Sequence, residues 1–194
     1  MDGSLPRSPW TSTVTAELVE QVRRIGSGRP CLVVAHSMGG VVATAAAEQA
    51  PELLAELMYV TAFAPVNGVP AVQYTFLPEN AGERVASGLS ADPAAVGALR
   101  YDTGDSDRRA AVRDTFYNDD VDEVTAERYG PVPHSYVVCA RDNAIRPDLQ
   151  RLFVSEIDAL SAKPTTVVEF DTSHSPFLSR PAALADVIAE RLRP

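Results

Sequence analysis

The sequence predicts an α/β protein in which a parallel sheet is flanked by helices. Short, continuous apolar segments such as 31–35 and 57–62 alternate along the chain with segments of helical character. Continuous apolar runs are typical of strands that are buried on both faces of a parallel sheet, and strand–helix alternation produces that sheet. The 194 residues are 45% hydrophobic and 22% charged, which is typical of a soluble globular domain.

The first part of the chain supplies two strand–helix units. We expect, in order, a loop over residues 1–13, a helix over 15–26, a strand over 31–35 buried on both faces, a helix over 38–50 and a second buried strand over 57–62. Thr15 is a suitable N-cap for the first helix. Helical spacing places Leu18, Val22 and Ile25 on the buried face of that helix.

The middle of the chain, residues 66–133, has a different character, because it is rich in proline and contains short helical segments such as 92–99. Strand–helix alternation then resumes, with strands over 135–140 and 165–170 and helices that begin at Pro147 and Pro181. The apolar faces predicted for these helices are Leu149, Leu152, Phe153, Ile157 and Leu160, and Leu184, Val187, Ile188 and Leu192. We therefore predict a core made of residues 1–65 and 134–194. Residues 66–133 would form a lid over the carboxyl ends of the strands, where open α/β sheets place their sites.

Charge and targeting signals exclude several classes of protein. The net charge of −9 argues against nucleic acid or an anionic membrane as a partner, because both require clustered positive charge. No apolar run reaches the roughly 18 residues of a membrane span, and no signal peptide is visible. Two cysteines, Cys31 and Cys139, are too few for a disulfide framework, which favours the reducing cytoplasm.

The motif Ala35-His36-Ser37-Met38-Gly39-Gly40 follows a predicted strand and opens a predicted helix. A strained strand-to-helix turn of this kind projects a serine hydroxyl above the edge of the sheet, and small neighbours allow the tight turn. The Met38 N–H, at the positive end of the helix, is then the natural donor to a developing oxyanion. The alternative is a glycine-containing turn with an incidental serine.

A nucleophilic serine needs a base, and the chain has three histidines. His36 adjoins Ser37 on the same turn, so we expect its side chain to point elsewhere. His134 begins a strand, where we expect a surface or cap residue. His174 lies between the last strand and the last helix, at the same sheet edge as Ser37, and is therefore the predicted base.

The base needs an orienting acid, and Asp142 follows the strand over 135–140 at the same sheet edge. The rival carboxylates are Asp171, which is close to His174 along the chain, and three residues of the middle segment: Asp102, Asp119 and Asp120. The alternative for Asp142 is an ordinary loop or cap carboxylate.

Four stretches resemble the α/β-hydrolases, in particular the small group that contains hydroxynitrile lyases, plant methylesterases and their bacterial relatives. They are Ala35 to Gly40, Tyr59 to Pro65, Tyr136 to Asp142 continuing to Gln150, and Asp171 to Phe177. The resemblance implies an α/β-hydrolase fold with Ser37 as nucleophile, His174 as general base and acid, and Asp142 as orienting acid. It also implies a pocket under the lid with Phe63, Phe76 and Phe177 as apolar lining, although ordinary core aromatics are the alternative.

Cyanohydrin lyases of this group typically carry a lysine after the triad histidine. Here Ser175 follows His174, and the single lysine, Lys163, is distant in sequence. We therefore expect hydrolysis of a small-molecule carboxylic ester through an acyl-enzyme, without metal or cofactor.

The chain departs from this family before residue 15, where no strand ending in a His-Gly loop is found. In the family, that loop supplies the second oxyanion donor. We therefore predict an N-terminally truncated fold of four strands, with a bare edge on the serine-bearing strand. Two hypotheses follow: a serine hydrolase, or a catalytically impaired hydrolase-fold protein that binds a ligand, a partner chain or a second copy of itself at the open edge.

Overall fold

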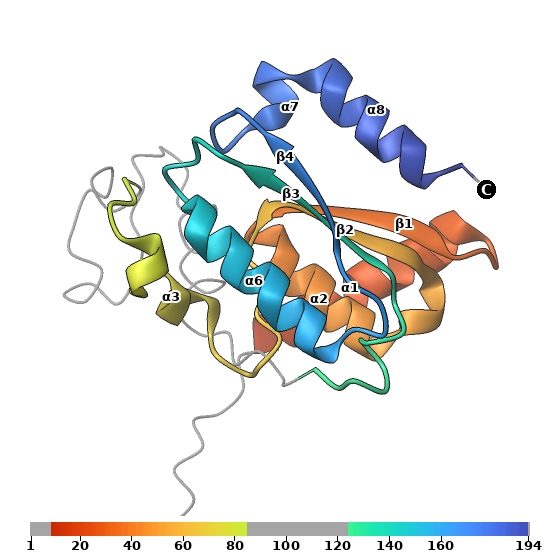
Figure 1. Cartoon of the computed structure of the whole chain (residues 1–194). Coiled ribbons are helices and arrows are strands. Elements are labelled where there is room, and N and C mark those ends of the chain that lie inside the picture. Colours follow the sequence, from red (N-terminus) through yellow and green to blue (C-terminus); the bar gives the residue numbers. More distant parts are fainter. Residues whose placement is uncertain (1–8, 85–123, 194) are drawn as a thin grey trace, which may run out of the picture.

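The computed structural model of the chain describes residues 9–84 and 124–193 (Figure 1). The helices and strands follow one another as α1 (Pro9–Gly26), β1 (Cys31–Ser37), α2 (Gly39–Gln49), η1 (Pro51–Leu53), β2 (Leu54–Ala62), α3 (Ala71–Tyr74), η2 (Pro78–Asn80), β3 (His134–Cys139), α6 (Pro147–Leu160), β4 (Thr166–Phe170), α7 (Pro176–Ser179) and α8 (Pro181–Arg191). The predicted helix over 92–99 and most of the predicted lid lie outside the described residues.

The four strands form one sheet in the order β1-β2-β3-β4, and every pair is parallel. The predicted parallel sheet flanked by helices is therefore confirmed. Because all strands run in the same direction, the loops that follow them gather at one edge. The end of β1 and the loops after β3 and β4 carry the three predicted catalytic residues to that edge.

Helices cover the sheet unequally on its two faces (Figure 1). The larger cluster of buried residues lies between the sheet and α2 and α6, and includes Tyr59, Tyr136 and Phe153. A smaller cluster on the other face joins Met58, Val60 and Val137 to Leu184 of α8. In Figure 1, α6 and α2 lie below the strands and α8 lies above them.

The first helix begins at Pro9, earlier than the predicted start at residue 15. Proline is favoured in a first helical turn, where its missing N–H is not needed. Thr15 therefore lies inside the helix, buried, and is not an N-cap. Ile25 is 69% exposed and Leu192, after α8, is also exposed, so neither lies on a buried face. Helical periodicity shows which residues share one face of a helix. It does not show how much of that face neighbouring elements cover.

The first strand was predicted to be buried on both faces, and this is wrong. Among the described residues β1 pairs with β2 only, and Val34 is 42% exposed. The predicted open edge on the serine-bearing strand is thus a feature of the described sheet. The second strand begins at Leu54 and is buried from Leu57 to its end.

Helix α2 passes very close to the end of β2. A Cβ atom at Gly40 would lie 2.0 Å from the Phe63 carbonyl oxygen and 2.9 Å from the Ala62 Cβ. Only glycine permits this approach, which brings the start of α2 and the serine turn down onto the sheet. In the part of the chain that the structure describes, every helix is too short or too polar to cross a membrane.

Candidate active site

Ser37 ends β1 and has a φ of +54°, in the left-handed region that non-glycine residues rarely adopt. Met38 follows it at the N-cap position of α2. The strained strand-to-helix turn predicted from the motif is therefore present. The turn sets the Ser37 hydroxyl at the carboxyl edge of the sheet and the Met38 N–H at the start of a helix.

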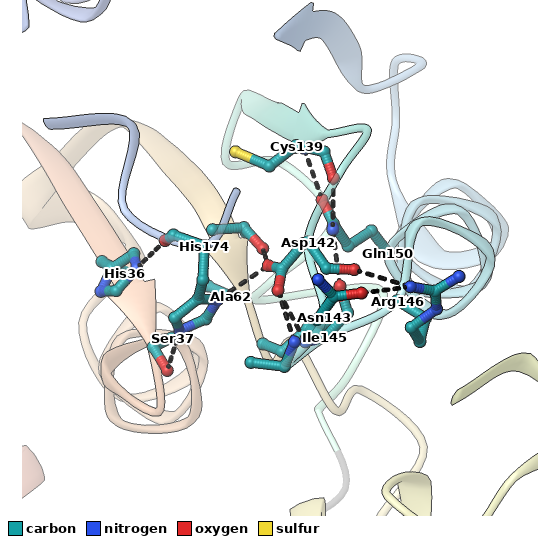
Figure 2. A network of polar contacts seen from close by, with 12 residues as sticks. His36, Ser37, Ala62, Cys139, Asp142, Asn143, Ile145, Arg146, Gln150 and His174 are labelled. Carbon is teal, nitrogen blue, oxygen red and sulfur yellow. Dashed lines mark hydrogen bonds and ion pairs between the residues drawn. The ribbon is translucent and has the colours of Figure 1, made fainter. Parts of the chain in front are cut away.

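The structure brings the three predicted catalytic residues together (Figure 2). The His174 Nε2 atom lies 3.0 Å from the Ser37 Oγ atom, and its Nδ1 atom lies 2.7 Å from the Asp142 Oδ2 atom. Asp142 is fully buried, while 26% of the His174 side chain is exposed. A carboxylate can only accept, so Nδ1 carries the proton and Nε2 presents its lone pair to the Ser37 hydroxyl.

The Asp142 carboxylate is saturated with hydrogen bonds. Oδ1 accepts from the N–H groups of Ala144 and Ile145, at 2.6 and 3.1 Å. Oδ2 accepts from His174 and from the Thr61 hydroxyl. Burial alone would raise the pKa of Asp142, but the hydrogen bonds from His174, Thr61 and Ala144 outweigh it and the pKa is lowered. Asp142 therefore remains ionised beside His174.

His36 contacts the loop that carries His174. Its Nε2 atom lies 2.7 Å from the His174 main-chain oxygen, and its ring packs 4.6 Å from the His174 ring and 5.0 Å, edge to face, from that of Phe177. Burial lowers the pKa of His36, which favours the neutral ring with Nε2 as the donor. The hydrogen bond from His36 thus goes to the main chain of the loop that carries His174.

His134 was predicted to be a surface or cap residue, and this is wrong. It begins β3 but is only 5% exposed, because its ring stacks on Tyr129 at 4.3 Å and its Nδ1 atom lies 3.1 Å from the Ser161 Oγ atom. Burial lowers the pKa of His134 to about 4. Since it lies at the amino end of a strand, it is on the opposite edge of the sheet from Ser37.

The three predicted lining phenylalanines have different environments. Phe63 is buried and packs against Phe153 with ring centres 5.8 Å apart, and its N–H donates to the Ser37 carbonyl oxygen at 3.0 Å. Phe76 is 81% exposed. Phe177 is partly exposed and lies beside His36 at the site. Of the three, the described contacts bring Phe63 and Phe177 next to the serine turn.

Two polar residues that support the site were not predicted. Thr61 donates to Asp142 from the end of β2. The Gln150 side chain accepts from the Cys139 N–H at 2.8 Å and donates to the Ile145 carbonyl at 2.7 Å, closing the loop that carries Asp142 (Figure 2). Thr61 is a polar residue within a buried strand, and Gln150 lies at helical spacing from Phe153 and Ile157 on the buried face of α6. A polar residue at a buried position is the signal that could have identified both.

Arg141 joins the loop that carries Asp142 to the loop that carries His174. The Arg141 Nε atom lies 2.8 Å from the Asp171 carboxylate, and the Arg141 N–H donates to the Thr172 carbonyl at 3.0 Å. No group of three metal-ligating side chains occurs within residues 9–84 and 124–193.

Comparison with known proteins places this geometry in context. A family model described as "Alpha/beta hydrolase family" matches residues 2–187. "Probable hydrolase R7" of Phoma sp. is 34% identical over 70 residues, which cover 36% of this chain and 29% of that protein. "Methylesterase 9" of Arabidopsis thaliana is 24% identical over 200 residues, covering 87% of this chain and 73% of that protein.

A crystal structure of the pyrethroid hydrolase PytH is similar in fold, with a TM-score of 0.72 and 19% identity. The match covers 96% of this chain and 78% of that one. The resemblance to the group that includes the plant methylesterases is confirmed by these matches.

Proposed function

The chain belongs to the alpha/beta hydrolase family, and from that premise we propose that it hydrolyses a small or medium carboxylic ester through an acyl-enzyme on Ser37. The observation that carries the proposal is the continuous series of hydrogen bonds from the Ser37 Oγ through His174 to Asp142. A neutral imidazole held by a buried carboxylate is the arrangement that activates a serine hydroxyl.

In the first half of the reaction, His174 Nε2 takes the Ser37 proton while Oγ attacks the ester carbonyl carbon. The Met38 N–H donates to the resulting oxyanion at the start of α2. Collapse of this intermediate expels the alcohol, which receives the proton from His174, and leaves the acyl group on Ser37. In the second half, His174 removes a proton from water, the hydroxide attacks the acyl carbon, and the proton returns to Ser37. Asp142 stays ionised throughout.

Ester hydrolysis is favoured over cyanohydrin cleavage by the residue after the base. Ser175 stands there and has no positive charge to hold cyanide. The name of the Arabidopsis relative, a methylesterase, points in the same direction. We also propose that residues 66–133 form a lid over the site, with Phe63, Phe76 and Phe177 in its apolar lining, and that the protein works in the cytoplasm, where the two free thiols, Cys31 and Cys139, remain reduced.

A fluorophosphonate probe tests the proposal directly. We expect wild-type protein to be labelled and Ser37→Ala to be unlabelled. His174→Ala should react at least about a hundredfold more slowly, since general-base catalysis contributes at least that much. Ser161→Ala is the matched control, because its hydroxyl lies near His134, away from the site, and its labelling should equal that of wild type. Folded wild-type protein that resists the probe would exclude a serine hydrolase.

A second candidate is favoured by the open side of β1, with Val34 exposed at the described sheet edge. In this alternative the chain is a catalytically impaired hydrolase-fold protein, and the β1 edge binds a ligand, a partner chain or a second copy. The same experiment separates the two, because this alternative requires a cooperatively folded chain that the probe does not label.

A further inference from the structure

The pairing of β1 with β2 is irregular at the site. His36 pairs with Val60, but Ser37 pairs with Ala62, so Thr61 is an extra residue in β2. Such a β-bulge redirects a side chain, and bulges are common next to active sites. Thr61 is fully buried and has a φ of +37°, which is a rare conformation for a β-branched residue. The surrounding structure must therefore hold it in place.

The residues around Thr61 supply that constraint. On the β1 side, the Phe63 N–H donates to the Ser37 carbonyl at 3.0 Å. On the β3 side, the buried Tyr136 hydroxyl donates to the Ala62 carbonyl at 2.6 Å and accepts from the Ala62 N–H at 3.1 Å. One side chain thus satisfies both backbone groups of the residue that follows the bulge. The end of β2 is held from both neighbouring strands.

The consequence of the bulge is a hydrogen bond to the acid of the site. The Thr61 hydroxyl donates to the Asp142 Oδ2 atom, the same oxygen that accepts from His174 Nδ1 at 2.7 Å. The other carboxylate oxygen is already occupied by two backbone N–H groups. The hydroxyl therefore completes the set of donors that orients the carboxylate, and it competes with His174 for one oxygen.

We propose that Thr61 is a positioning residue for ester hydrolysis, acting through Asp142. Its hydroxyl fixes the rotation of the carboxylate toward His174 and shares the negative charge on Oδ2. The strained bulge is the means by which a strand residue reaches this position. The inference rests on the proposed function, and the experiment below distinguishes failure of the one from failure of the other.

The primary variant is Thr61→Val, which keeps the side-chain shape and removes the hydroxyl. We expect kcat to fall about tenfold or more with KM within about twofold, because a tenfold change corresponds to the loss of one hydrogen bond to a charged group. Thr61→Ser keeps the donor and should restore kcat. Thr44→Val is the matched control, because Thr44 is equally buried and hydrogen-bonded, to Gly40 and Tyr59, but makes no bond to the triad. Its kcat should be unchanged.

Thr61→Gly is a second variant, which is needed in case Thr61→Val fails to fold because of backbone strain at this position. Glycine adopts positive φ readily, so this variant keeps the bulge conformation without the hydroxyl. It should therefore fold and still show the reduced kcat. A normal kcat in both Thr61→Val and Thr61→Gly would overturn the proposal.

Proton NMR of the His174 Nδ1–H gives a readout that does not need turnover. Thr61→Val removes both a competing donor to Oδ2 and a constraint on the carboxylate, so the Nδ1–H resonance should leave its wild-type position in this variant and remain in place in Thr61→Ser and Thr44→Val. If wild type hydrolyses no ester, the proposed function fails, yet the shift still tests the role of Thr61. An unmoved resonance, or a loss expressed only in KM, would show a purely structural role and refute positioning.

Discussion

Three histidines of one chain occupy three chemical environments, and their neighbours explain the difference. His174 is partly exposed and donates to an ionised carboxylate, so it can accept a proton from Ser37. His36 is held neutral by burial and donates to the main chain of the base. His134 is buried against Tyr129, far from any carboxylate of the site. The type of residue alone therefore does not identify the base.

His134 should make the fold sensitive to acid. Its pKa is about 4 in the folded protein against 6.5 as the reference, so between these values the unfolded chain binds more protons and lowering the pH favours unfolding. Urea unfolding at pH 7 and pH 4.5 measures the effect. In His134→Phe, which keeps an aromatic ring against Tyr129, the loss of unfolding free energy between the two pH values should be smaller by about 2 to 3 kcal/mol. An equal loss in both proteins would contradict this assignment.

Site residues that are marked by a local sequence motif, or by their position after a strand, could be predicted. Residues whose role depends on contacts between distant segments of the chain could not. Ser37 is marked by its motif, and Asp142 and His174 by their positions after strands. The roles of His36 and Thr61 depend on the register between β1 and β2 and on where the loop of the base returns. No spacing along the sequence encodes that register, because it results from packing between segments that are far apart in the chain.

At the scale of elements, the close contact between α2 and the end of β2 sets how near the serine turn lies to the sheet. We expect Gly40→Ala to destabilise the fold by about 3 kcal/mol, the upper end of the usual cost of overpacking, because its Cβ would collide with the backbone carbonyl of Phe63. Gly39→Ala is the matched control. Nothing lies within 4 Å of a Cβ there, so its unfolding free energy should be unchanged or slightly higher. Chemical denaturation of both variants decides the matter.

The order and type of the four strands and of helices α1, α2, α6 and α8 followed from the sequence, because hydrophobic period and helix-starting prolines are local signals. The short helices η1, α3, η2 and α7 were not predicted. Boundaries and burial were less predictable. The apolar run of β1 was read as a fully buried strand, yet Val34 is exposed, since a continuous apolar segment does not reveal whether a neighbour lies on each side. Thr15 is a predicted N-cap that instead lies inside α1, because the helix begins further upstream, at Pro9.

At the scale of the molecule, both outer strands of the described sheet have one partner, but they differ in composition. β1 is apolar throughout its first half, whereas β4 carries Glu169, which pairs with Arg151. Charged side chains protect an edge strand from pairing with other chains. β1 is therefore the edge at which we expect self-association.

Sedimentation velocity across a concentration series tests this expectation. Val34→Lys should weaken self-association by about tenfold or more, equivalent to about 1.4 kcal/mol. Val167→Lys places the same charge at a comparably exposed position of β4 and should leave self-association unchanged. A wild-type chain that stays monomeric at all concentrations would refute the expectation.

The hydrogen bond between Ser37 and His174 joins residues that are 137 positions apart in the chain. The bond exists only after β4 has been added to β3 and the loop beyond it has folded back onto β1. A growing chain that has emerged up to β3 therefore carries the serine turn but not the base. Contacts of such long range form late and slowly in folding. In the proposed mechanism, Ser37 therefore meets its base only once β4 and the loop beyond it are in place.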